Sequence, residues 1–197
     1  MSVSSAEELL RLASVEKIRL VRHLLVAAAL RELLSAEPIV VGGTAEEFYT
    51  ADEYHETDLD VCAWLSSEEE TLLTDLGFER RGRHWVHLAS KVPVEFPEAR
   101  IDGDEARVRY EQVGAGQAAI IGVEDLYLDR IRQATVDPDA DTVSFHSALA
   151  IGAAAFDSID WPYVEQRIES TIDVDPVLGK LMKDLDRRIR RRIRKAP

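Results

Sequence analysis

The sequence predicts an α+β fold with a mixed α/β core, in which helices flank a sheet and a helical region follows it. Three observations carry this prediction. A β-branched run at Ile39–Val41 has the character of a buried strand. Short alternating segments broken by turn residues follow between residues 58 and 97. From Val123 onward only helical patterns remain, so we expect a core domain in residues 1–122 and a helical subdomain in residues 123–197.

Two helices are expected before the first strand. The run Ser5-Ala6-Glu7-Glu8 fits a capping box, which marks the start of a short first helix. A longer helix is predicted from about Val15 to Leu34. Pro38 ends it, because the residue before a proline disfavours helical geometry. We interpret this helix pair as packing for the sheet.

A glycine turn follows the first strand. Gly42 and Gly43 let the backbone bend sharply and approach whatever lies above it. Thr44 then opens a segment long enough for one or two helical turns. Backbone amides at such a helix N-terminus suit an anionic ligand such as a phosphate.

Two aspartates share a face of the second predicted strand. Asp58 and Asp60 alternate with Leu59 and Val61, and in a strand residues two apart point the same way. Two carboxylates on one core strand repel each other unless a cation lies between them. Because oxygen ligands favour a hard cation, Mg²⁺ is the first choice.

The order Gly42-Gly43-Thr44, then Asp58 and Asp60, resembles the polymerase-β-like nucleotidyltransferase superfamily. It is most similar to the small prokaryotic branch, which includes antibiotic nucleotidyltransferases and the toxin-like enzymes of toxin–antitoxin systems. The resemblance implies a core sheet of that fold, with Gly42, Gly43 and Thr44 binding the phosphates of a nucleoside triphosphate. It also implies that Asp58, Asp60 and a third carboxylate hold two Mg²⁺ ions. Thr44 stands where serine is commoner, and the gap to Asp58 is slightly long.

Glu95 is our choice for the third carboxylate. In the segment Val92–Phe96 it alternates with apolar residues, so it faces away from the apolar side. In the superfamily that the sequence resembles, the last ligand lies on such a strand, after a helix and a hairpin. Glu98 and Asp102 are weaker alternatives.

Other polar residues are weaker candidates for a functional role. His55 precedes the second strand and is a candidate substrate contact. His84 and His87 lie three apart rather than on one strand face, so they make a poor metal pair. The resemblance suggests that Asp129 and Arg130 lie beside the nucleotide pocket, although charge pairs on a helix surface are the preferred explanation.

Turn and capping residues divide the rest of the chain. Ser66 and Ser67 cap a helix that ends at Gly77, and a hairpin follows in residues 78–88. We expect one β-like patch at residues 107–110 and a last short strand at Ile120 and Ile121. The predicted C-terminal helices begin near Val123, Asp141, Trp161 and Pro176.

Composition and charge limit the class of protein. The chain has 197 residues, 46% of them hydrophobic, as in ordinary globular proteins. Its longest apolar run, Leu24–Leu30, is far shorter than the roughly 20 residues of a membrane helix. The N-terminus has acidic residues where a signal peptide needs basic ones, so we expect a cytoplasmic protein without membrane partners. The net charge is −13, yet Arg187–Lys195 carries seven basic residues.

We therefore expect a metal-dependent, ATP-binding or other NTP-binding nucleotidyltransferase. It would move a nucleoside monophosphate to a hydroxyl acceptor on tRNA, a protein or a small molecule. The small size suits the toxin of a toxin–antitoxin pair with an antitoxin partner, and the apolar helices can supply a homodimer face. Arg187–Lys195 can contact RNA phosphates or an acidic partner, or fold back onto the acidic body. Two alternatives stay open: a non-catalytic module that binds a nucleotide or partner, and a nucleic-acid-binding accessory protein acting through Arg187–Lys195.

Overall fold

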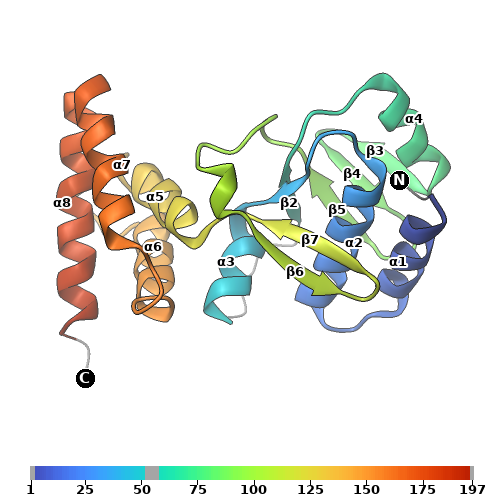
Figure 1. Cartoon of the computed structure of the whole chain (residues 1–197), viewed down its shortest axis with the longest axis horizontal. Coiled ribbons are helices and arrows are strands. Elements are labelled where there is room, and N and C mark those ends of the chain that lie inside the picture. The colour runs from blue at the N-terminus through green and yellow to red at the C-terminus, as the bar shows by residue number, and fades with distance from the viewer. Residues whose placement is uncertain (1–2, 52–57, 196–197) are drawn as a thin grey trace. The chain divides into compact units, whose positions relative to one another are not determined.

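The computed structural model describes residues 3–51 and 58–195 (Figure 1). They divide into two compact units, one formed by Met1–Phe48 with Asp52–Gly122 and one by Tyr49–Ala51 with Val123–Pro197. The first unit is a sheet with helices, and the second is built of helices. The fold is therefore a mixed α+β arrangement with a helical C-terminal region, as the sequence predicts.

A mixed sheet of seven strands organises the first unit (Figure 1). Its spatial order is β3-β4-β5-β2-β1-β7-β6. The pairs β2–β5 and β1–β7 are parallel, and the remaining neighbours are antiparallel. The strands are β1 (Ile39–Val40), β2 (Leu59–Cys62), β3 (Phe78–Arg81), β4 (His84–His87), β5 (Val92–Glu95), β6 (Arg109–Val113) and β7 (Gly116–Ile120).

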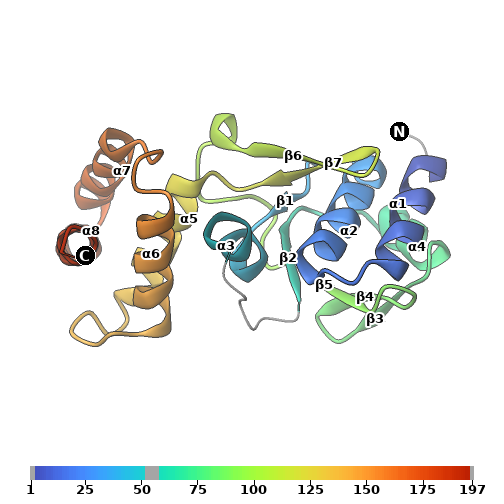
Figure 2. The same cartoon turned by 90° about the horizontal axis from the view of Figure 1, so that it is seen from below.

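Two N-terminal helices cover part of this sheet. Helix α1 (Val3–Val15) packs on α2 (Arg19–Leu33), and α2 contacts β2, β5, β6 and β7 (Figure 2). The middle of α2 carries Ala27, Ala28 and Ala29, all fully buried, and their small side chains let the helix approach both α1 and the sheet closely. The helix pair is packing for the sheet, as expected.

Helix α4 (Ser67–Asp75) begins with a capping box. The Ser66 hydroxyl accepts a hydrogen bond from the Glu69 amide, and the Glu69 carboxylate accepts one from the Ser66 amide at 2.8 Å. Glu69 also accepts a hydrogen bond from the Ser35 amide at 2.6 Å, which ties α4 to the segment after α2. Burial opposes ionisation of Glu69, but the hydrogen bonds from Ser35 and Ser66 outweigh it and lower its pKa to about 2.

The last hairpin of the sheet is longer than the sequence suggests. The prediction gave a β-like patch at residues 107–110 and a short strand at Ile120 and Ile121, whereas β6 and β7 are paired over five residues each. Polar side chains fill β6, so its alternation is hard to detect in the sequence. The turn between the strands includes Gly114, whose φ of +57° suits glycine.

The second unit contains four described helices. They are α5 (Val123–Ala134), α6 (Val143–Ala154), α7 (Trp161–Val174) and α8 (Pro176–Ile193). Side chains cap three of them, since Thr142, Asp160 and Asp175 each accept a hydrogen bond from a backbone amide in the following turn. Across the described segments, no helix has both the length and the apolar character needed to cross a membrane.

Buried polar side chains hold the start of α5 against α7 and α8. The Tyr127 hydroxyl donates to Asp186 at 2.9 Å, and Arg190 pairs with the same carboxylate at 2.9 Å. The Tyr163 hydroxyl likewise donates to Asp125 at 2.7 Å. Burial, reinforced by Asp125, raises the pKa of Tyr163 to about 12. These satisfied polar contacts fix which helix faces meet.

Most of the basic C-terminal segment forms the end of α8, which stops at Ile193. Arg188 pairs with Asp141 and donates to the carbonyl of Pro138 at 2.8 Å. Arg188 and Arg192 lie over the ring of Phe145, with guanidinium-to-centroid distances of 4.4 and 5.0 Å. Part of the basic segment therefore serves to pack its own helical unit, which is one of the alternatives left open by the sequence.

Candidate functional site

Strand register places four polar side chains on one face of the sheet. Asp60 in β2 is the Cα partner of Glu95 in β5, and His84 in β4 is also a partner of Glu95. Partnered residues in neighbouring strands point to the same face, and Asp58 lies two residues before Asp60. The flanking residues alternate as this requires, since Leu59 and Val94 are fully buried whereas Asp60 and Glu95 are partly exposed.

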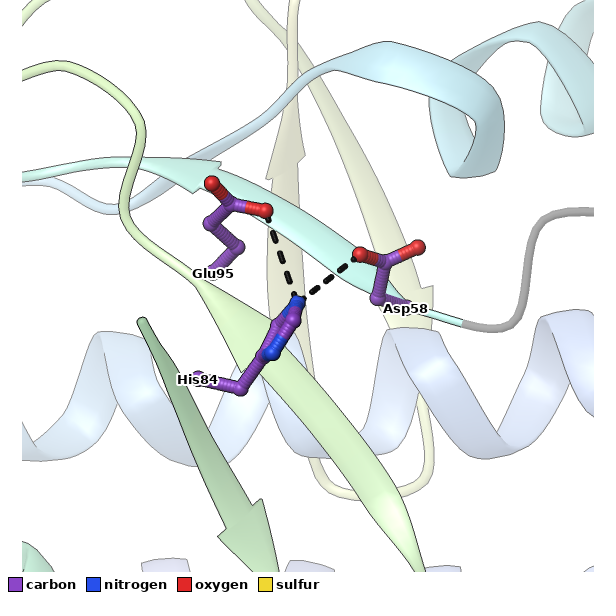
Figure 3. Close-up of side chains that lie close together, drawn as sticks. All are labelled: Asp58, His84 and Glu95. Carbon is purple, nitrogen blue, oxygen red and sulfur yellow. Dashed lines mark hydrogen bonds and ion pairs between the residues drawn. The ribbon is translucent and has the colours of Figure 1, made fainter. Parts of the chain in front are cut away.

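Three of these side chains converge on one point. His84 Nε2 lies 3.2 Å from Asp58 Oδ2 and 3.5 Å from Glu95 Oε2 (Figure 3). One ligand atom from each residue lies within 4.8 Å of the others. All three side chains are partly buried, with 16–27% of their surface exposed. The cluster is thus open to a small ligand and partly shielded from solvent.

Asp60 lies against the glycine turn. Gly42, the first residue of α3 (Gly42–Thr50), has a φ of +61°. A Cβ placed on Gly42 would lie 2.1 Å from Asp60 Oδ2 and 3.1 Å from Asp60 Cβ. The Val41 amide also donates to the Asp60 carbonyl at 3.0 Å. Only glycine fits at position 42 without displacing the carboxylate, so the position of the Asp60 side chain depends on the glycine in the turn.

The side chain of Thr44 is buried beneath this turn. Its hydroxyl lies 3.0 Å from His23 Nδ1 and 3.4 Å from the Asp58 carbonyl, to which it donates. Burial of His23, together with the positive charges of Arg19 and Arg22, lowers its pKa to about 4, so the imidazole is neutral at physiological pH. The hydroxyl therefore ties the start of α3 to α2 and β2, and a ligand at this turn would meet backbone amides, chiefly those of Gly42 and Gly43.

Arg83 borders the cluster on the turn between β3 and β4. Its Nε lies 3.1 Å from Glu95 Oε2, but 70% of the arginine side chain is exposed. An ion pair this exposed is screened by water and can rearrange at little cost. Arg83 can therefore leave Glu95 when another cation binds there.

The residues predicted from the sequence occupy two adjoining positions. Asp58 and Glu95 meet at His84, and Asp60 lies beside Gly42 in register with Glu95. The alternatives Glu98 and Asp102 are exposed and lie beyond the end of β5.

His84 is the residue that sequence reasoning missed. It is on the same face as Glu95, whereas His87 is buried on the other face and lies 2.7 Å from the Ser90 hydroxyl. His55 lies outside the described residues. Asp129 and Arg130, which the resemblance suggested lie beside the nucleotide pocket, contact each other and Gln133 within the helical unit.

The fold is shared with a solved nucleotidyltransferase-like protein. Over 91% of this chain and 94% of the other, the structure matches an antigenic nucleotidyltransferase-like protein from Paracoccidioides brasiliensis, with a TM-score of 0.52 and 13% sequence identity. No protein-family model and no curated protein matches the sequence. The chain thus has a nucleotidyltransferase-like fold, and the chemistry of its site must be argued from its own residues.

The donor set of the cluster can hold a divalent cation. Asp58 and Glu95 supply carboxylate oxygens and His84 supplies an imidazole nitrogen, all ordinary ligands of divalent metals. Asp60 adds a fourth donor on the same face. A cation would relieve the repulsion between these carboxylates.

Proposed function

We propose that the protein is a metal-dependent nucleotidyltransferase, which transfers a nucleoside monophosphate from an NTP to a hydroxyl group and releases pyrophosphate. One observation carries the proposal. Three carboxylates, those of Asp58, Asp60 and Glu95, share one sheet face beside the glycine turn at the start of α3. A nucleotidyltransferase-like fold supports it.

Each part of the site has a role in this reaction. Asp58, Asp60 and Glu95 would hold two Mg²⁺ ions, which when bound supply Lewis acidity to the phosphates and the attacking hydroxyl. Backbone amides of Gly42 and Gly43 would bind the triphosphate at the N-terminus of α3. The Thr44 hydroxyl would act indirectly, because its contacts with His23 and β2 keep those amides in place.

A basic groove in the helical unit supports RNA as the acceptor. The groove lies between α7 and α8 and encloses about 710 Å³. Three acidic residues line the groove and form ion pairs with Lys183 or Arg190. Six basic residues line it, on α8 and just beyond its end: Lys183, Arg187, Arg190, Arg191, Arg194 and Lys195. On a chain with a net charge of −13, such a group of basic residues favours a phosphate backbone. A cytoplasmic toxin that modifies tRNA, paired with an antitoxin, fits this picture.

The test is nucleotide transfer by matched variants. Wild type, Asp60→Asn and Glu79→Gln are incubated with Mg²⁺, each α-³²P-labelled NTP and either tRNA or a protein extract. Glu79 is the control, since it is an exposed carboxylate on β3, outside the cluster. We expect label on tRNA with wild type and Glu79→Gln, and a loss of about 100-fold or more with Asp60→Asn. Equal labelling by wild type and Asp60→Asn contradicts the proposal.

A non-catalytic binding module is the second candidate function. His84 already contacts Asp58 and Glu95, and Arg83 pairs with Glu95, so both carboxylates have side-chain partners without a metal. NTP binding by calorimetry without labelling of any acceptor, and with binding unchanged in Asp60→Asn, would favour this function.

A further inference from the structure

We propose that His84 is itself a metal ligand, and that it makes the site prefer a first-row transition dication such as Mn²⁺ over Mg²⁺. The inference deepens the proposed function, on which it rests for the presence of a metal here. It starts from the position of the imidazole. Figure 3 shows Nε2 pointing between the two carboxylates, with contacts to both Asp58 and Glu95.

The spacing of the donor atoms fits ligands of one ion. Octahedral ligands at roughly 2.0–2.2 Å from a dication lie about 2.8–3.1 Å from their neighbours, which is the bond length multiplied by √2. The distances from Nε2 to Asp58 Oδ2 and Glu95 Oε2 are 3.2 and 3.5 Å. Closing these gaps by a few tenths of an ångström needs only small side-chain rotations. A cation between the three residues is therefore compatible with the backbone as it stands.

Two of the three donors lie in paired strands, and the third lies directly before a strand. Glu95 and His84 are Cα partners in adjacent strands, and Asp58 directly precedes β2, which pairs with β5. Trp85, next to His84, is buried on the opposite face of the sheet, and its burial keeps His84 on the face that carries Glu95. Donors mounted on paired strands keep their spacing when a ligand enters.

The chemistry of the nitrogen ligand sets the preference. Mg²⁺ is a hard cation that binds oxygen and loses its water reluctantly. Imidazole suits first-row transition dications, whose affinity for nitrogen-containing sites exceeds that of Mg²⁺. Asp58 and Glu95 alone would make an oxygen site suited to Mg²⁺. His84 converts it into a mixed site with two oxygens and one nitrogen.

The same contacts would also arise if His84 were a protonated bridge that replaces a metal. The two roles predict opposite effects of removing the imidazole. A ligand's removal weakens metal binding, whereas removal of a competing cation strengthens it. Metal affinity measured without NTP therefore distinguishes them, and it does not depend on catalysis.

The experiment measures metal binding by the full-length chain. Mn²⁺ is titrated into wild type, His84→Ala and His146→Gln and followed by electron paramagnetic resonance, and Mg²⁺ affinity is obtained by competition. His146 is an exposed histidine on α6 and controls for loss of a surface imidazole. We expect wild type and His146→Gln to bind Mn²⁺ at least tenfold more tightly than Mg²⁺. His84→Ala should lose about 10–100-fold in Mn²⁺ affinity and little in Mg²⁺ affinity.

A spectroscopic measurement on wild type protects the test against a variant that fails to fold. Electron spin echo modulation of bound Mn²⁺ should show coupling to an imidazole ¹⁴N, and His146→Gln should retain it. Absence of nitrogen coupling in wild type, or unchanged or tighter Mn²⁺ binding in His84→Ala, would overturn the inference. Selective Mn²⁺ binding without any nucleotide transfer would refute the proposed function and leave this inference standing.

Discussion

Replacing Gly42 by alanine tests the link between the glycine turn and the carboxylates. Gly42 has a φ of +61°, in the left-handed region, and its position leaves no room for a Cβ beside Asp60. Gly82, in the turn between β3 and β4, has a φ of +64° but no heavy atom within 4 Å of an added Cβ. Both substitutions impose the same backbone strain, and only one adds a collision, so Gly82→Ala is a matched control.

The expected magnitudes follow from these two terms. Left-handed geometry costs a residue with a Cβ about 1–2 kcal/mol, which is the whole expected effect of Gly82→Ala. Forcing an extra methyl into a packed site adds about 1–3 kcal/mol. Rotation of the Asp60 side chain can relieve the contacts of 2.1 and 3.0 Å with its Oδ2 and Cγ, but not the contact of 3.1 Å with its Cβ. We therefore expect Gly42→Ala to destabilise the protein by about 2–5 kcal/mol and to turn the Asp60 carboxylate away from the site.

Urea unfolding followed by tryptophan fluorescence measures both variants, together with Asp60→Ala and the double variant Gly42→Ala/Asp60→Ala. Because Asp60→Ala removes Cγ and both oxygens, the double variant should be about 1–2 kcal/mol more stable than additivity predicts. Equal destabilisation by Gly42→Ala and Gly82→Ala, with no coupling to Asp60, would show that the turn and the carboxylate are independent.

Three further predictions concern stability. Folding lowers the pKa of Glu69 from 4.5 to about 2, so the contribution of its carboxylate to the free energy of unfolding is complete above pH 4.5 and is lost as the pH falls toward 2. Glu69→Gln should cost about 1–2 kcal/mol at pH 7. In urea unfolding measured as a function of pH, the variant should show a smaller loss of stability between pH 4.5 and 2. Folding lowers the pKa of His23 from 6.5 to about 4, so the unfolded chain binds more protons between these values and stability falls as the pH drops through this window. His23→Gln should remove that slope, and an unchanged slope would exclude His23 as its source. Tyr127→Phe deletes the hydroxyl bound to Asp186 and should cost about 1–3 kcal/mol in thermal unfolding, whereas Tyr110→Phe, at an exposed position on β6, should cost almost nothing.

The sequence predicted most of the elements that build the site because their signals are local. Alternation around Asp58 and Asp60 and around Glu95 indicated two strands with one polar face each, and β2 and β5 have that pattern. The glycine pair and the cap at Ser66 depend only on neighbouring residues, so a single sequence reveals them.

Two features of the site depend on contacts that are distant in sequence. Thr44 was interpreted as a phosphate ligand because it follows the glycines, yet its hydroxyl bonds with His23, 21 residues earlier on α2. His84 was compared with His87, its neighbour in sequence, instead of with Glu95, its neighbour in space. No local pattern contains either contact, since each is formed only when α2 packs and the strands pair.

The position of His84 beside Glu95 was nonetheless within reach of a register argument. The loop of residues 88–91 joins β4 to β5, so His87 pairs with Val92 and each step outward fixes one more pair, ending at His84 and Glu95. Side chains alternate with a period of two, so a slip of one residue in this hairpin would turn His84 or Glu95 to the buried face. Trp85 and Val94, which are partners in this hairpin, are buried, and such a slip would turn one of them to the exposed face, which makes it costly. The apolar side of the hairpin therefore selects the register that brings the polar side together, and the chemistry of this site depends on the packing on the opposite face of the same strands.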